Sequence, residues 1–226
     1  MVVYIGHDQR ESIGTHVFIS SLLRHTRAPI PITILDKNIL ERSRDSVAEG
    51  TNAFTLSRFL VPYFQGWKGW AVFMDGADML MRDDIYKMFD LMHMYSAVQV
   101  VHHNYDTKHE RKYVGTKMES DNTMYARKNW ASVMLINCSH YAWRQITPEY
   151  INSVDKMHML QFKFMDDKFI SSLPNAYNWL CDEYGTNNDA KVLHWTCGVP
   201  GFPAYRNAPH ADEWLAEVKN VNYATD

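Results

Sequence analysis

The stretch Phe73-Met74-Asp75-Gly76-Ala77-Asp78-Met79-Leu80 sets two carboxylates directly after an apolar run that begins at Trp70. A short apolar run that ends in turn residues predicts a buried strand, here over 70–74, near the centre of a sheet. Because charged side chains do not belong inside a sheet, Asp75 and Asp78 are expected at its exposed carboxyl edge. Carboxylates there suit a hard cation, Mg²⁺ or Mn²⁺. The structural alternative is that Asp75 ends the strand and Asp78 stabilises a turn.

The chain before this stretch has the order strand, helix, strand. An apolar run at 2–6 predicts a strand, apolar positions at helical spacing predict a helix over 11–25, and 31–35 predicts a second strand. This order is typical of an α/β fold. Parallel α/β sheets bind ligands at the carboxyl ends of their strands, so the loop at 6–10 is the first candidate for a nucleotide or phosphate.

The remaining pattern predicts further alternation of helices and strands. Helices are expected at 55–65, at 85–92 after an Asp83-Asp84 cap, from Thr147 onward and at 166–173, and strands at 96–101, 132–136 and 191–195. The polar segment 102–129 is too long for an ordinary connection and is expected to be a functional excursion from the core.

The composition indicates one globular domain over residues 1–226, with a C-terminal tail. The chain has 46% apolar and 22% charged residues, which excludes disordered and fibrous classes. Its net charge of -3 argues against a protein that binds nucleic acid over its whole surface. Three widely spaced cysteines favour a reducing compartment. We find no signal peptide and no membrane-spanning run, so a cytoplasmic protein without a membrane partner is expected.

Other side chains are candidates for the same site. His194 follows the last predicted strand and could supply a nitrogen ligand, although a hydrogen-bonded structural histidine is the alternative. Arg10 and Arg58 could bind phosphate oxygens or lie solvated at the surface. The run 108–128 mixes basic residues with tyrosines, which suits a nucleic acid or a phosphorylated acceptor, but its acidic residues also fit a solvated excursion. The chain has no GxGxxG, P-loop, GxSxG or HExxH motif, which disfavours dinucleotide enzymes, P-loop phosphoryl transfer and common hydrolases.

Four stretches, taken in order, resemble nucleotide-sugar glycosyltransferases of the GT-A fold, similar to the glycogenin and galactosyltransferase-like family (family 8) and its bacterial and phage relatives. They span most of the chain: Tyr4 to Glu11, Phe54 to Phe59 with Phe73 to Asp78, Lys128 to Asn137, and Asp166-Asp167 through Leu173-Pro174-Asn175-Ala176-Tyr177-Asn178-Trp179-Leu180 to His194-Trp195-Thr196-Cys197-Gly198. The resemblance implies a Rossmann-like, mostly parallel sheet flanked by helices.

The resemblance also implies residue roles. It makes Asp75, Asp78 and His194 the ligands of Mn²⁺ or Mg²⁺, with Asp75 also facing the donor diphosphate. The donor contacts that it implies are Gly6, His7, Asp8 and Arg10 for the base and ribose, and Arg58 for the diphosphate or sugar. Lys128 is a further expected donor-binding residue. The catalytic candidates that it places against the donor sugar and acceptor are Asn137, Asp166 and Asp167.

The sequence departs from the family at two points. The usual acidic motif is Asp-x-Asp, whereas one more residue separates Asp75 from Asp78, so a turn at Gly76 is needed for both to converge. Tyr177 stands where relatives carry Trp.

The expected activity is metal-dependent transfer from a UDP-sugar, with retention and with the diphosphate helping to deprotonate the acceptor. The acceptor stays open between a glycan, a small molecule and a nucleic-acid base. The alternatives are a metal-dependent nucleotide or phosphodiester hydrolase, and a non-catalytic nucleotide or glycan binder.

Overall fold

The core of the protein is a six-stranded sheet in the order β2-β1-β3-β8-β5-β9, seen in a computed structural model that describes residues 1–36 and 54–221. Five strands run in one direction and β8 runs against its two neighbours. This confirms the expected mostly parallel α/β sheet, with β3 inside it. The strands are β1 (Val2–Gly6), β2 (Ile32–Leu35), β3 (Trp70–Met74), β5 (Val98–Val100), β8 (Val133–Asn137) and β9 (Ile170–Ser172).

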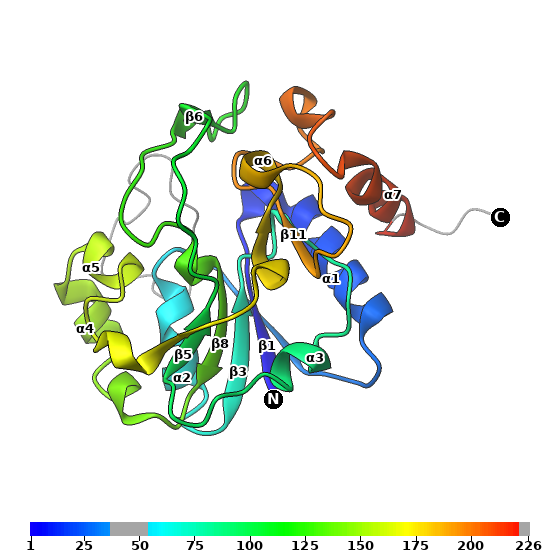
Figure 1. Cartoon of the computed structure of the whole chain (residues 1–226). Coiled ribbons are helices and arrows are strands. Elements are labelled where there is room, and N and C mark those ends of the chain that lie inside the picture. The colour runs from blue at the N-terminus through cyan, green and yellow to red at the C-terminus, as the bar shows by residue number, and fades with distance from the viewer. Residues whose placement is uncertain (37–53, 222–226) are drawn as a thin grey trace.

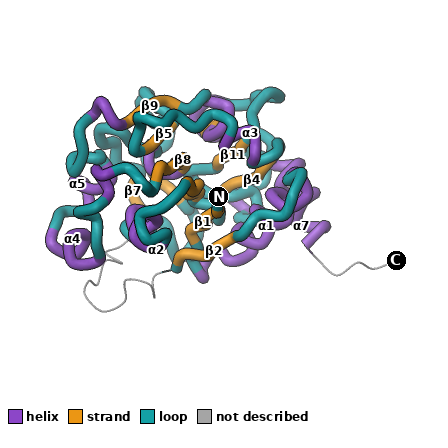
Figure 2. The backbone as a smooth tube through the Cα atoms, turned by 90° about the horizontal axis from the view of Figure 1, so that it is seen from below, coloured by secondary structure: helices purple, strands orange, loops and turns teal. Residues whose placement is uncertain are grey.

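Helices cover both faces of this sheet (Figures 1 and 2). Successive strand residues point to opposite faces, so Val3 and Ile5 belong to one apolar cluster and Tyr4 to another. The first cluster packs on α1 (Ser12–His25) and α3 (Tyr86–Phe89), and α7 (Ala211–Val221) lies outside α1. The second packs on α2 (Val61–Phe64), α4 (Pro148–Ser153) and α5 (Lys156–Leu160). Apolar packing therefore covers both faces of the sheet, which leaves the ends of the strands for ligands.

A second, smaller sheet lies at the carboxyl edge of the first. It has the order β10-β11-β4, with β4 at Met79–Met81, β10 at Trp179–Leu180 and β11 at Val192–His194, and α6 (Cys181–Tyr184) follows β10. β4 and β11 are antiparallel, with His194 opposite Met79. This pairing carries a residue from late in the chain to the loop that follows β3.

The excursion at 102–129 contains a two-stranded ribbon, β6 (Arg111–Lys112) and β7 (Ser120–Asp121). Figure 1 shows it beyond the edge where β1 and β3 end. Short 3-10 turns complete the chain at Gln9–Glu11, Ser57–Leu60, Trp130–Ser132, Tyr141–Trp143, Asp167–Phe169, Asn175–Asn178 and Pro203–Tyr205.

Three predicted elements need correction. The helix expected at 166–173 is wrong, because only a 3-10 turn forms before Ile170–Ser172 joins the sheet beside β5. The helix expected at 55–65 is divided into the turn Ser57–Leu60 and α2. The helix expected at 85–92 is only Tyr86–Phe89. In the described part of the chain, no helix has the length and apolar character that a bilayer crossing requires.

Candidate functional site

The loop after β3 turns back sharply, which brings its two carboxylates together. The amide of Ala77 donates to the carbonyl of Asp75 at 2.8 Å, and that of Met79 donates to Gly76 at 3.1 Å. Gly76 has a φ of +73°, and a Cβ there would lie 2.3 Å from Cγ2 of Ile5. Only glycine fits both conditions without strain. The turn thus accommodates the extra residue between Asp75 and Asp78.

His194 reaches this loop through the small sheet. Its neighbour Trp195 donates its amide to the carbonyl of Asp78 at 2.9 Å, which extends the β4–β11 pairing to the acidic loop. One potential ligand atom from each of Asp75, Asp78 and His194 lies within 4.8 Å of the others, and all three residues are buried. The structure therefore brings the three predicted metal ligands to one place.

The contacts of His194 indicate whether this cluster fits a cation. The amide nitrogen of Asn178 donates to Oγ of Ser132 at 2.8 Å, so its Oδ1 is the atom that lies 2.8 Å from Nδ1 of His194. Nδ1 then donates to Asn178, and Nε2 faces Oδ2 of Asp78 at 3.3 Å. Oδ1 of Asp78 is buried and has no hydrogen-bond partner in the described part of the chain. A divalent cation would satisfy all of these atoms.

Burial dominates the electrostatics of the cluster. It raises the pKa of Asp75 to about 6, against the effect of Arg58, whose Nη1 lies 2.8 Å away. Burial also disfavours the Asp78 carboxylate, but His194 outweighs it and lowers the pKa of Asp78. Burial and the nearby Asp78 raise the pKa of Glu11 well above its ordinary value. Crowded, desolvated carboxyl groups of this kind are stabilised by a bound cation.

Arg58 is fixed in a buried position beside the cluster. Its Nη1 donates to the carbonyl of Ala131 at 2.9 Å, and its guanidinium lies over the rings of Phe54 and Phe73, at 5.3 and 5.1 Å. Stacking on both rings limits its motion. The side chain therefore holds Asp75 in place and also faces the cavity described next.

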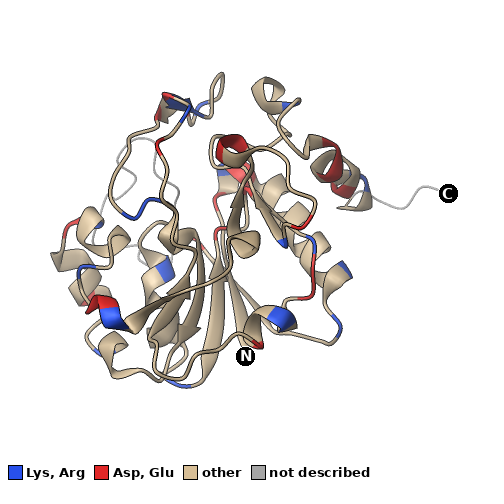
Figure 3. Cartoon of the chain, viewed as in Figure 1, with Lys and Arg blue, Asp and Glu red and all other residues tan. Residues whose placement is uncertain are grey.

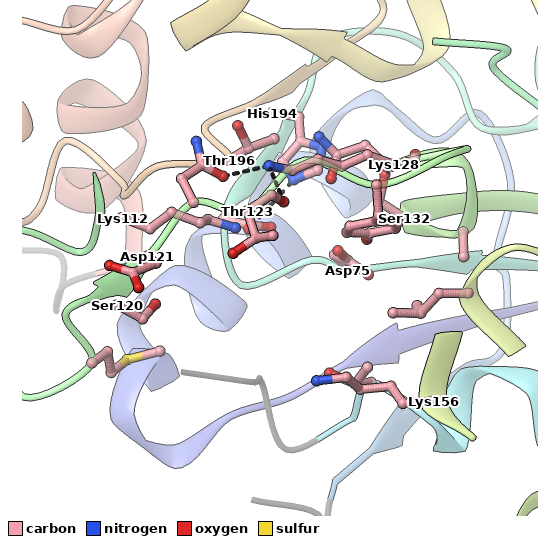
Figure 4. A pocket seen from close by; sticks show the side chains of 18 of the residues that line it. Asp75, Lys112, Ser120, Asp121, Thr123, Lys128, Ser132, Lys156, His194 and Thr196 are labelled. Carbon is pink, nitrogen blue, oxygen red and sulfur yellow. Dashed lines mark hydrogen bonds and ion pairs between the residues drawn. The ribbon is translucent and has the colours of Figure 1, made fainter. Parts of the chain in front are cut away.

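A cavity of about 820 Å³ opens onto the cluster, and cations line its wall. Figure 4 shows Lys112 and Lys128 in the pocket with Asp75 and His194. Lys128 is buried and donates to Oδ1 of Asn122 and, at 3.1 Å, to the carbonyl of Thr123. Burial, with the nearby Lys112, lowers the pKa of Lys128 to about 8. Two neighbouring ammonium groups beside a cation site suit a polyanionic ligand such as a diphosphate.

The charged rim of the cavity comes from the excursion, whereas α6 and α7 carry acidic residues (Figure 3). Arg10 also lines the cavity. Asp8 is buried behind it and holds its guanidinium, with Oδ2 2.6 Å from Nη2. Gly6 ends β1, and His7 contacts Thr15 at 3.0 Å. Of these four predicted base and ribose contacts, Arg10 is thus the one that the structure brings to the cavity wall.

None of the three predicted catalytic residues lines this cavity. Asn137 ends β8, which runs antiparallel to β3, and it pairs with Trp70 at the start of β3. It therefore lies at the opposite end of the strands from Asp75. Asp166 and Asp167 are exposed and form ion pairs with Lys168 and Arg127. Strand direction separates Asn137 from Asp75, whereas Asp167 reaches the cavity wall through its ion pair with Arg127. The roles of these residues toward the donor sugar stay a prediction.

The structure adds three residues to which the sequence had given no role in the site. Asn178 orients His194, Lys112 enters the cavity from β6, and Glu11 is buried near Asp78 with both carboxylate oxygens unpartnered within the described residues. Asn178 and Glu11 stand in stretches of the family resemblance, and Lys112 stands in the basic run. Their roles depend on tertiary contacts, so no local signal identifies them.

Replacing Asn178 with Ala is expected to weaken metal binding by about 10- to 100-fold, the usual effect of losing the partner of a histidine ligand. His194 would lose the acceptor that fixes its tautomer. Isothermal titration of Mn²⁺ measures the change. The exposed Asn188→Ala is the matched control and should bind like the wild type; equal affinity in both variants would contradict the role of Asn178.

Comparisons with solved structures identify the fold as that of GT-A-like glycosyltransferases. The bifunctional glycosyltransferase WbbM superposes with a TM-score of 0.63 at 14% identity, over 97% of this chain and 50% of WbbM. GlyE of Streptococcus pneumoniae TIGR4 gives 0.62 at 16% identity, over 99% of this chain and 64% of GlyE. The galactosyltransferase LgtC gives 0.63 at 15% identity, over 100% of this chain and 98% of LgtC. The chain thus spans less than two thirds of WbbM and GlyE, and nearly all of LgtC.

A curated relative defines the family. The chain is 31% identical to Protein CDI of Arabidopsis thaliana over 229 aligned positions, which cover 97% of this chain and 86% of the relative. The protein therefore belongs to the family of Protein CDI. No family model matches the sequence.

Proposed function

We propose that the protein is a metal-dependent glycosyltransferase, of the family 8 type, that transfers a sugar from a UDP-sugar. The observation that carries the proposal is the meeting of Asp75, Asp78 and His194 at a cavity whose wall presents Lys112 and Lys128, within a glycosyltransferase fold. A cation-binding cluster beside two ammonium groups provides the positive charge that binding of a nucleoside diphosphate requires.

Asp75, Asp78 and His194 are the residues that would hold Mn²⁺ or Mg²⁺, and the bound ion would supply Lewis-acid stabilisation of the diphosphate. Asn178 keeps Nε2 of His194 directed at the acidic loop, and Arg58 holds Asp75. Lys112 and Lys128 add positive charge where the leaving diphosphate becomes more negative. Each of these groups is fixed before the glycosidic bond breaks, which is how preorganised charge lowers a barrier.

The carboxylates of the large cavity favour a reaction without a protein nucleophile. Besides Asp75 and Asp78, the acidic residues that line it in the described part of the chain are Glu119 and Asp121. Both are bonded to Arg111, at 3.0 and 2.6 Å. We therefore propose transfer with retention in which the diphosphate itself takes the acceptor proton, rather than a covalent glycosyl-enzyme.

The proposal is tested by measuring UDP release from UDP-glucose, UDP-galactose and UDP-N-acetylglucosamine with Mn²⁺. We expect release with at least one donor and its loss with EDTA. No release, together with no UDP binding by calorimetry, would overturn the proposal. Cleavage of sugar-free UDP or UTP would instead indicate a hydrolase.

The affinity for UDP is expected to fall as the pH rises above about 8. A bound diphosphate favours the charged form of Lys128, whose pKa is lowered to about 8 by burial. Below that pH the ammonium is present and affinity is constant; above it affinity falls by up to about tenfold per pH unit. Calorimetry with Mg²⁺ between pH 6.5 and 9.5 measures this. Lys128→Arg should shift the fall beyond the range, and an unchanged profile in that variant would contradict the assignment.

A further inference from the structure

The excursion at 102–129 is held against α6 by one buried carboxylate. Glu183 of α6 accepts a hydrogen bond at Oε1 from the hydroxyl of Thr107, at 2.5 Å, and at Oε2 from the amide of Lys108, at 3.0 Å. The main-chain carbonyl of Glu183 also accepts from Nζ of Lys108 at 2.7 Å. Both donors to the carboxylate itself are neutral groups, so its charge remains to act on cations nearby.

Asn122 continues this chain of contacts from Thr107 toward the large cavity. Its amide nitrogen donates to the hydroxyl oxygen of Thr107 at 2.8 Å and to the carbonyl of His109 at 2.9 Å. Because a carbonyl can only accept, these contacts fix which way the buried amide is turned. Its Oδ1 is therefore the atom that faces Lys128, and Nζ of Lys128 donates to it.

The hydrogen bonds of this chain all point in one direction. Lys128 donates to Asn122, Asn122 donates to Thr107, and the single hydroxyl proton of Thr107 goes to the carboxylate of Glu183. Bonds that follow one another in this way polarise each other, and the effect is larger in a buried setting than in water. An ammonium at the donor end and a carboxylate at the acceptor end are the charges that such a chain favours.

Lys128 keeps one donor for a ligand. Its ammonium has three N–H groups, of which one donates to Asn122 and one to the carbonyl of Thr123 at 3.1 Å (Figure 4). The same side chain lines the large cavity together with Asp75 and His194. The third N–H is thus the one that a diphosphate in the cavity can use.

The titratable groups that face Lys128 act in opposite directions. Burial and the neighbouring Lys112 of β6 lower its pKa, whereas Cys197 and Glu183 of α6 raise it. Burial raises the pKa of the Cys197 thiol to about 12, so this group carries no charge near neutral pH. Among these neighbours, Glu183 is therefore the acid that favours the charged form of Lys128.

We propose that Glu183 is a positioning residue for the donor: through Thr107 and Asn122 it holds Lys128 in the orientation and the charge state in which its third N–H binds the diphosphate. This inference rests on the proposed function, because it takes the ligand of Lys128 to be a nucleoside diphosphate. It gives a role in the site to a side chain of α6 that does not line the cavity.

Lysine-selective ¹³C NMR on the full chain without UDP measures the coupling directly. The ε-carbon signal of Lys128, identified by its absence in Lys128→Met, should titrate in the wild type with a midpoint near pH 8. Glu183→Gln can still accept from Thr107 but carries no charge, and we expect it to lower this midpoint by about one pH unit. Glu110→Gln, which neutralises an exposed acid of the same excursion, is the matched control and should leave it unchanged. Equal midpoints in Glu183→Gln and the wild type would overturn the proposal.

Calorimetry with UDP and Mg²⁺ measures the consequence for the donor. Glu183→Gln should bind UDP about fivefold more weakly than the wild type at pH 8 and nearly as tightly at pH 6.5, because only the protonated fraction of Lys128 changes. A merely structural role would weaken binding equally at both pH values, and that result would contradict the proposal. In a Lys128→Met background, Glu183→Gln should have no further effect on the ratio of the two affinities.

Two substitutions of Thr107 test the route between the two charges. Thr107→Val keeps the shape but removes the hydroxyl, and it should weaken UDP binding by about tenfold even at pH 6.5, whereas Thr107→Ser should restore it. Unchanged affinity in Thr107→Val would overturn the route through Asn122. Absence of UDP binding in the wild type would instead overturn the proposed function, and the NMR titration without UDP would still decide whether Glu183 acts on Lys128.

Discussion

Asp78→Asn is expected to reduce UDP release from the donor by about a thousandfold, because a bound divalent ion contributes several kcal/mol of transition-state stabilisation and ~1.4 kcal/mol is a factor of ten. Asp78 is one of the three clustered ligands and lies 3.3 Å from Nε2 of His194, so the amide removes a charge that would bind the ion. Mn²⁺ titration by calorimetry should show a parallel loss of affinity. The substitution keeps the shape of the side chain, removes its charge and replaces one acceptor oxygen with an amide donor.

Two measurements separate loss of the ion from loss of the fold. His194 outweighs burial and lowers the pKa of Asp78, so the carboxylate stabilises the folded protein, and the variant should melt slightly below the metal-free wild type while still unfolding in one cooperative transition. Asp189→Asn is the matched control, since Asp189 is exposed in a loop before β11, and it should retain full activity. If Asp78→Asn bound Mn²⁺ as tightly as the wild type, the cluster would not be a metal site.

The parts of the site that depend on chain-local features could be predicted. Asp75 and Asp78 come shortly after β3, and the glycine at position 76 indicates the turn between them. His194 was found because it follows a strand, although its pairing opposite Met79 is a tertiary event. The position of Asn137 shows the converse: β8 looks like any buried strand, and nothing local shows that it runs antiparallel to β3 and ends at the opposite end of the sheet from Asp75.

Elements with weak or mixed patterns were also hard to predict. Ile170–Ser172 is too short for its period to distinguish a strand from a helix, and its partner β5 decided the outcome. The excursion was recognised by its length and polarity, but its ribbon and the inward position of Lys112 depend on pairing between Arg111–Lys112 and Ser120–Asp121.

The position of the acidic loop depends on a close contact with α1. At Gly14, a Cβ would lie 1.8 Å from the carbonyl oxygen of Ala77 and 2.9 Å from its carbonyl carbon. Ala77 stands between the two carboxylates of the loop. Because both partners of this contact are backbone, neither a rotamer change nor a flexible side-chain end can relieve it, and any side chain at position 14 must move the helix or the loop.

Gly14→Ala is therefore expected to lower the free energy of unfolding by about 2 kcal/mol, the cost of overpacking less the better helix propensity of alanine. For a chain of this size that corresponds to a melting temperature lower by ~5 °C. We also expect Mn²⁺ affinity to fall by about tenfold, because the loop moves relative to His194. Thermal unfolding and Mn²⁺ titration measure the two effects.

The neighbouring Ile13→Ala provides the control, since this side chain is 64% exposed on the same helix. It should leave both quantities nearly unchanged. A Gly14→Ala protein that melted lower but bound Mn²⁺ normally would show that the helix, and not the loop, gives way. Loss of both would show that the tight packing of α1 on Ala77 is what holds Asp75 and Asp78 at the distance from His194 that one ion requires.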